Sequence, residues 1–295
     1  MSLPRAYAPL AGFVGPAAPR SELWRLAVGV TLIIALALAL GTAFGALLGL
    51  LPQAIYIAYA EAKGSGPGEV LYLLLGFSFF LVSVSVCIDL WHGRSPLTLL
   101  GRPALALRHG WRVLVALIAL NVALWLLPPW DNTDLRPGLP LVTWVALLPL
   151  SLVAVFIQVT TEEVLFRGYL LQQLAARFAH PAAWMVLPSA VFGALHFDPS
   201  LGGNSIWVIS SAMLFGIAAC DLTARSGSLG PAIALHFVNN ASAFLLVTAQ
   251  DDLSGLALFR LTVDLGDPAQ LRNVLLIDTG VMLCSWLAAR VALRR

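Results

Sequence analysis

The stretch LAVGVTLIIALALALGTAFGALLGLL, residues 26–51, contains no charged side chain. A helix of about 20 apolar residues crosses the ~30 Å hydrocarbon core of a bilayer, and this run is longer than that. The whole chain has the same character, since 59% of its 295 residues are hydrophobic and only 11% are charged. Ordinary soluble domains carry about 25% charged residues. The composition therefore excludes an ordinary soluble enzyme and a disordered chain, and it indicates a protein that crosses the membrane several times.

Seven further apolar runs follow along the chain. They predict an all-α fold, a polytopic membrane helix bundle of about eight transmembrane helices. The runs are 70–88, 111–127, 141 to beyond Glu162, 182–196, 205–220, 231–247 and 273–291. We expect residues 26–295 to form one transmembrane helical domain.

The distribution of arginine predicts how the bundle is oriented. Arginines gather at residues 5–25, 94–112 and 290–295, whereas the loops at 61–69, 131–136 and 251–267 lean acidic. Because loops rich in arginine stay in the cytoplasm, an even number of spans with both termini cytoplasmic is predicted, in the cell membrane. Residues 1–25, which are rich in proline, are expected to be a flexible cytoplasmic tail.

The charge balance bears on the partners. A net charge of +2 gives no reason to expect a nucleic-acid partner. The lipid bilayer is the expected surrounding, and the sequence leaves the oligomeric state open.

Polar side chains interrupt the apolar runs in one third of the chain, within TTEEVLFRGYL (160–170), VFGALHF (191–197) and ALHFVNN (234–240). An ionisable group deep in a bilayer costs about 2.5–3.5 kcal/mol on insertion scales, so it needs a partner or a purpose. Asp278, in the last run, lies apart from these three stretches. The polar residues of interest are Glu162, Glu163, Arg167, His196, His236, Asn239 and Asn240.

Helical spacing separates the two adjacent glutamates. Glu163 and Arg167 are four residues apart and can form an ion pair on one face. Glu162 is rotated by about 100° and faces another partner. We expect the helix to break and restart at Pro149 and to run to about Phe178, because only then does Glu162 lie deep in the membrane.

These residue types suit hydrolysis of a carbonyl compound. A carboxylate and an imidazole that converge on one water can deprotonate it. A second imidazole and a side-chain amide can donate to the oxyanion that develops. A metal site, with zinc as the possible ion, is an alternative use of Glu162 or Glu163 together with His196 and His236.

Three motifs in this order resemble those of the CAAX-processing and bacteriocin-processing intramembrane proteases, the CPBP or Abi family. The resemblance covers about residues 158–243, within an expected catalytic core of about 150–247. The motifs are EExxxR (Glu162, Glu163, Arg167), FxxxH (Phe192, His196) and HxxxN (His236, Asn240).

The resemblance implies an endopeptidase that acts on a peptide or membrane protein, with CAAX-type processing as one possibility. It implies that Glu162 and His196 activate water, that His236 and Asn240 stabilise the oxyanion, and that Glu163 and Arg167 support them. Members of the family have been regarded both as metalloproteases and as metal-free glutamate proteases. We favour the metal-free form, because an asparagine is a better hydrogen-bond donor than a zinc ligand.

Two other classes of function fit the same residues. The polar cluster could hold helices together in a non-catalytic immunity or scaffold protein. It could also relay protons in a transporter, although the internal repeats typical of transporters are not found.

Overall fold

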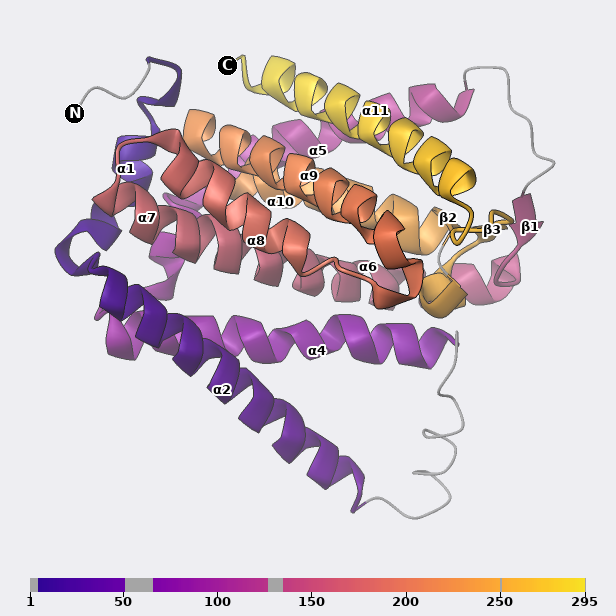
Figure 1. Cartoon of the computed structure of the whole chain (residues 1–295), viewed down its shortest axis with the longest axis horizontal. Coiled ribbons are helices and arrows are strands. Elements are labelled where there is room, and N and C mark those ends of the chain that lie inside the picture. The colour runs from indigo at the N-terminus through magenta and orange to yellow at the C-terminus, as the bar shows by residue number, and fades with distance from the viewer. Residues whose placement is uncertain (1–4, 51–65, 127–134, 250, 295) are drawn as a thin grey trace.

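The apolar runs form long helices in the computed structural model, which describes residues 5–50, 66–126, 135–249 and 251–294 (Figure 1). The stretches 61–65 and 131–134 of the expected acidic loops lie outside the described residues. The long helices are α2 (Leu23–Leu48), α4 (Pro67–Val86), α5 (Pro103–Leu126), α6 (Leu141–Glu163), α9 (Ser205–Ser226) and α11 (Pro268–Leu293). The short ones are α1 (Leu10–Val14), α7 (Leu171–Arg177), α8 (Leu187–Ala194) and α10 (Gly230–Ala241).

Shorter helical turns join or extend these helices. The 3-10 turns are Arg5–Tyr7, Gly15–Arg20, Pro96–Leu100, Pro199–Asn204 and Asp251–Leu256. The π-helical turns are Cys87–Trp91, Val164–Leu170, Ala182–Val186 and Ser242–Leu246.

The all-α class and the multi-pass membrane character are confirmed. Six helical segments in the described ranges are long and apolar enough to cross a bilayer. The expected spans 182–196 and 231–247 correspond to shorter helices, namely Ala182–Ala194 and α10 with its π-helical end. The expected span 111–127 begins earlier, at Pro103, so Arg108 and Arg112 lie on helix α5 rather than in a loop.

The expected break at Pro149 is not present. Helix α6 runs through Pro149 to Glu163 and continues through the π-helical turn Val164–Leu170 into α7. A membrane helix tolerates proline where neighbouring groups satisfy the freed backbone atoms. The result is one segment of 37 residues, Leu141–Arg177. Glu162 lies near its middle because the helix extends beyond it, and not because the helix restarts before it.

The N-terminal residues also differ from expectation, since residues 5–22 pack on the bundle instead of forming a flexible tail. Leu10 and Phe13 are each 1% exposed. The Tyr7 hydroxyl donates to Oδ1 of Asp221 on α9 at 2.8 Å. Apolar residues three and four apart give this short helix a stripe that it can bury, which the proline content of the segment concealed. Residues 1–4 lie outside the described residues.

A small three-stranded sheet lies at the end of the bundle away from α1 and α7 (Figure 1). Its order is β1-β3-β2, and β3 (Phe259–Leu261) pairs antiparallel with β1 (Leu135–Pro137) and parallel with β2 (Val247–Thr248). The strands are too short to change the fold class. They tie the start of α6 to the segment that follows α10.

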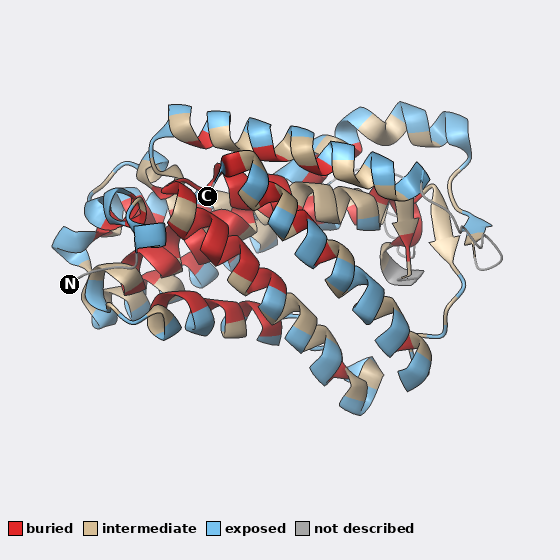
Figure 2. Ribbon diagram, turned by 90° about the horizontal axis from the view of Figure 1, so that it is seen from above, coloured by how far each residue is buried: buried red, intermediate tan, exposed pale blue. Residues whose placement is uncertain are grey.

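The core lies between the helices that carry the three motifs. Figure 2 shows buried residues gathered in the half of the bundle nearest the N-terminus, with largely exposed faces on the outer helices. One buried cluster joins Phe166, Phe192, Phe215 and Leu235, which come from the π-helical turn after α6, from α8, from α9 and from α10. This packing brings motif residues from distant parts of the sequence to one place.

Candidate active site

A buried ion pair lies where helix α6 continues into its π-helical turn. Oε1 of Glu163 lies 2.9 Å from Nη1 of Arg167, and both side chains are almost fully buried. The ion pair expected from the four-residue spacing is therefore present. Arg167 lies on the π-helical turn Val164–Leu170, a type of turn that is frequent at functional sites.

His236 on α10 lies between the two adjacent carboxylates. Its Nδ1 is 2.8 Å from Oε1 of Glu163, and its Nε2 is 3.5 Å from Oε2 of Glu162. The side chain of Glu163 is 0% exposed, whereas that of Glu162 is 17% exposed. Of the two carboxylates, Glu162 is therefore the one that an incoming molecule can reach.

A glutamine that the sequence analysis did not identify connects two of the predicted residues. Nε2 of Gln158 donates to Oε1 of Glu162 at 2.7 Å, and Nδ2 of Asn240 donates to Oε1 of Gln158 at 2.9 Å. Gln158 is four residues before Glu162, so it lies on the same face of α6. That spacing is the signal that could have revealed it.

Aromatic rings enclose the charged part of the cluster. The guanidinium of Arg167 lies 4.6 Å from the ring centroid of Phe192, and the ring of Phe215 lies 4.7 Å from that of His236. Such rings attract the cation and keep water out. In these surroundings the attraction between Glu163 and Arg167 is stronger than it is in water.

His196 lies beside this cluster rather than within it. It follows the end of α8 and is exposed, and its Nδ1 is 2.9 Å from the carbonyl oxygen of Phe192. Its ring is 4.7 Å from that of Phe192, which in turn is 6.1 Å from that of His236. In the described ranges no hydrogen bond or ion pair joins His196 to Glu162. The structure thus brings together five of the six predicted residues: Glu162, Glu163, Arg167, His236 and Asn240.

The predicted residues do not form a metal site in this arrangement. Among the described residues, no group of three or more His, Cys, Asp or Glu side chains is placed to hold a metal ion. Glu163 and His236 are bonded to each other, and His196 stands apart from both. A zinc site needs its ligands to converge on one point, so the donor set does not fit, and we derive no step through a metal.

A second buried polar group supports the π-helical turn from the side of the 87–101 loop. Nε2 of His92 lies 2.9 Å from the hydroxyl of Tyr169, and Nε2 of Gln173 donates to Nδ1 of His92 at 3.1 Å. Burial, followed by the nearby charge of Arg94, lowers the pKa of His92 to about 4. A neutral His92 that accepts at Nδ1 can donate from Nε2 to Tyr169.

Fold and site together define a class of protein: a multi-pass helical membrane protein that holds a buried carboxylate–imidazole cluster of the kind used in hydrolysis. Comparison with known proteins identifies a family that part of the chain resembles. Residues 143–242 match the family model described as type II CAAX prenyl endopeptidase Rce1-like. This segment includes every predicted site residue, and the expected resemblance to the CPBP family is confirmed over it. Over this segment the chain is similar to the CAAX-type endopeptidases that the family model describes.

One curated protein is also similar to part of the chain. The uncharacterized protein YyaK of Bacillus subtilis (strain 168) is 29% identical over 123 residues, which are 41% of this chain and 41% of that protein. The chain thus matches less than half the length of this relative. No solved structure matches the chain.

Proposed function

We propose that this protein is an intramembrane endopeptidase that hydrolyses a peptide bond in a peptide or membrane-protein substrate. The observation that carries the proposal is the position of Glu162, the accessible end of an otherwise buried hydrogen-bonded cluster. A carboxylate in that position can take a proton from water while its neighbours keep it in place. CAAX-type substrates, which the name of the matched family model suggests, are the first to try.

The first step is the activation of water by Glu162 together with His196. The carboxylate takes a proton from the water, whose oxygen forms a bond to the carbonyl carbon of the peptide. Because Nδ1 of His196 faces the carbonyl oxygen of Phe192, the ring proton belongs on Nδ1. Nε2 is then left with a free lone pair that can accept a hydrogen bond from water. His196 supplies this lone pair from the exposed side of the cluster, where a substrate arrives.

The second requirement is a pair of donors for the oxyanion. When His236 is protonated at both nitrogens, one N–H remains with Glu163 and the other points from Nε2 beside Glu162. Asn240 gives one amide hydrogen to Gln158 and keeps a second one. These two N–H groups stabilise the negative oxygen. The proton held by Glu162 then moves to the leaving nitrogen as the C–N bond breaks.

Glu163 and Arg167 act as positioning residues. Their buried ion pair fixes the carboxylate that holds the His236 ring, and neither side chain is accessible to a substrate. They therefore set the direction of the His236 Nε2 atom without touching the reacting groups.

The same proposal places the protein in the cell membrane with both termini cytoplasmic. Helix α1 and the C-terminal end of α11 lie at the same end of the bundle (Figure 1). That end also carries the arginines of residues 5–25 and 290–294. The positive-inside rule supports a cytoplasmic location for this end.

The deciding experiment measures cleavage of a panel of quenched fluorogenic peptides, including a farnesylated CAAX peptide, by the purified full chain. Glu162→Gln keeps the shape of the side chain but removes the base, so we expect cleavage to fall by about 10²–10⁴-fold. Glu22→Gln is the matched control, because Glu22 pairs with Arg25 far from the site and its side chain is 45% exposed. Full activity in Glu162→Gln contradicts the proposal. No cleavage of any peptide by well-folded protein favours the non-catalytic scaffold instead.

A further inference from the structure

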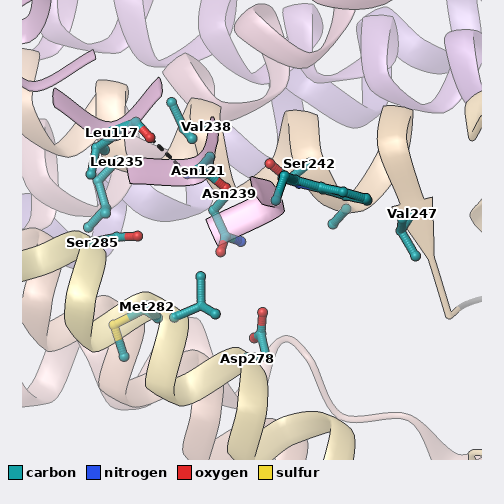
Figure 3. Close-up of a pocket in the computed structure, with 13 residues that line it drawn as sticks. Leu117, Asn121, Leu235, Val238, Asn239, Ser242, Val247, Asp278, Met282 and Ser285 are labelled. Carbon is teal, nitrogen blue, oxygen red and sulfur yellow. Dashed lines mark hydrogen bonds between the residues drawn. The ribbon is translucent and has the colours of Figure 1, made fainter. Parts of the chain in front are cut away.

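A second polar space lies next to the proposed site, between α5, α10 and α11. It is a cavity of about 190 Å³ whose lining includes the polar residues Asn121, Asn239, Ser242, Asp278 and Ser285. Figure 3 shows the side chains of Asn239, Asp278 and Ser285 turned toward the same space. The mechanism proposed above uses none of these five residues.

The one acidic residue of the cavity lining has no basic partner among the lining residues. Asp278 lies near the middle of α11 and is an exposed residue at the edge of the cavity, and in the described part of the chain no basic side chain or hydrogen-bond donor pairs with it. A lone carboxylate in a membrane span is costly. The carboxylate oxygens of Asp278 also add to the hydrogen-bond acceptors of the cavity. Such acceptors favour a ligand that carries a positive charge or several hydrogen-bond donors.

The walls select among positively charged ligands. Apolar side chains, including Leu117, Leu235, Val238 and Met282, make up much of the lining beside the polar ones. A bare metal cation gains nothing from such walls, and a proton alone does not need a cavity of about 190 Å³. A lysine or arginine side chain suits both the apolar walls and the acidic residue, because its methylene stem is apolar and its head is charged.

The cavity is connected to the proposed catalytic residues through one pair of neighbours. Nδ2 of Asn239, which lines the cavity, donates to Oδ1 of Asn240 at 3.3 Å. Asn240 is the proposed oxyanion donor. A substrate peptide held at Asn240 therefore passes close to the cavity with a residue near its cleaved bond.

From this juxtaposition, we propose that the cavity is a specificity pocket for a basic side chain of the substrate, with Asp278 as the counter-ion of that side chain. This inference rests on the proposed function, because it gives the protease a substrate class: peptides with lysine or arginine near the cleaved bond.

The test compares matched peptides that differ at one position, with lysine, norleucine or glutamate placed in turn at each residue around the cleaved bond. Norleucine has nearly the shape of lysine without its charge. We expect one position at which the protein cleaves the lysine peptide with a kcat/KM about tenfold higher than that for the norleucine peptide, equivalent to about 1.4 kcal/mol. Asp278→Asn should remove this preference and leave cleavage of the norleucine peptide unchanged.

Two further variants separate charge from folding. Asp278→Glu keeps the charge and should retain the preference for lysine. Asp89→Asn removes an exposed carboxylate outside the cavity lining and should behave as the parent protein. If the lysine and norleucine peptides are cleaved equally at every position, or if Asp278→Asn keeps the preference, the pocket is not a basic-residue site. A last outcome is an equal change in the cleavage rates of the lysine and norleucine peptides when sodium is replaced by potassium, seen in the parent protein but not in Asp278→Asn. That result would mean that a free cation occupies the cavity, and it too would overturn the basic-residue pocket.

A binding measurement distinguishes failure of the pocket from failure of the proposed function. Fluorescein-labelled lysine and norleucine peptides are titrated with Glu162→Gln and with the double variant that also carries Asp278→Asn, and fluorescence anisotropy is read. Tighter binding of the lysine peptide that depends on Asp278 supports the pocket even where no cleavage occurs. Equal binding of the two peptides overturns it.

Discussion

The Nδ1 atom of His236 lies 2.8 Å from Oε1 of Glu163, although 73 residues separate the two in sequence. The same carboxylate oxygen is bonded to Arg167, so one buried oxygen fixes a cation on its own helix and an imidazole on another. This contact joins the first motif to the third. Because Glu162 is the adjacent residue, fixing Glu163 also fixes where the proposed base stands relative to His236.

Substitution by glutamine should mainly affect stability at Glu163 and mainly affect activity at Glu162. Glu163→Gln leaves Arg167 without its buried partner, and breaking such a pair costs about 3–5 kcal/mol. We expect a clear drop in the thermal unfolding midpoint of the protein in detergent. Glu162→Gln should leave the midpoint nearly unchanged and lower cleavage by about 10²–10⁴-fold. Equal unfolding midpoints for the two variants would contradict the assignment of Glu163 as the structural member of the pair.

Gln158 should affect activity more than stability. Gln158→Met removes the donor to Glu162 and the acceptor of Asn240 while keeping a side chain of similar length. A hydrogen bond to a charged group contributes about 1.5–3 kcal/mol, so we expect kcat to fall by about 10- to 100-fold. The measurement is the rate on the best peptide of the panel. An unchanged kcat would show that Glu162 needs no support from this residue.

The stability of the protein should fall in acid because of His92. Its pKa is about 4 in the folded protein and about 6.5 in an exposed histidine, so the unfolded chain takes up a proton first. The free energy of unfolding should therefore decrease as the pH is lowered from about 6.5 to about 4 and be unaffected by this group above that range. His92→Gln should reduce the slope in thermal unfolding, whereas the exposed His180→Gln should leave it unchanged. If the free energy of unfolding of His92→Gln depends on pH as steeply as that of the parent protein, His92 is not the cause of the loss of stability in acid.

Two glycines of α2 provide a matched test of packing. A Cβ at Gly29 would collide with the hydroxyl of Tyr169, whereas one at Gly45 meets nothing within 4 Å. We expect Gly29→Ala to destabilise the protein by about 1–3 kcal/mol. Gly45→Ala should be neutral or stabilising by about 0.5–1 kcal/mol, because alanine is the better helix former. Thermal unfolding of the two variants side by side checks this, and equal midpoints would mean that α2 does not press against Tyr169.

Metal removal gives a further check on the proposed mechanism. Since the described carboxylates and imidazoles do not converge as metal ligands, we expect a chelator such as EDTA to leave the rate of peptide cleavage unchanged. Glu162→Gln, measured in the same buffer, serves as the inactive reference. A rate that falls with EDTA and returns with added zinc would contradict the metal-free mechanism.

Features within one helix could be predicted from the sequence. The pairing of Glu163 with Arg167 follows from the four-residue spacing alone, and the same geometry keeps Arg167 away from Glu162. The membrane class follows from composition. Neither inference depends on how the helices are arranged in space.

Features that depend on tertiary packing could not be predicted in the same way. The contact of His236 with both carboxylates requires the relative position of α6 and α10, which no local pattern contains. His196 was expected to join the cluster, but α8 ends at Ala194, so this residue lies beyond the helix on its exposed side. Pro149 suggested a break, whereas the surrounding helices accommodate it within α6. Asp278 was an isolated charge in the sequence and acquired a context only from the cavity around it.

The packing of the N-terminal segment has a consequence for biosynthesis. Tyr7 and Asp221 are 214 residues apart, so Leu10 and Phe13 leave the ribosome long before their binding surface on α9 exists. At ~5–20 residues per second, the delay is roughly 10–40 s. During this time the apolar face of α1 is available to the membrane surface or to a chaperone. This segment is therefore synthesised well before it can reach its native contacts.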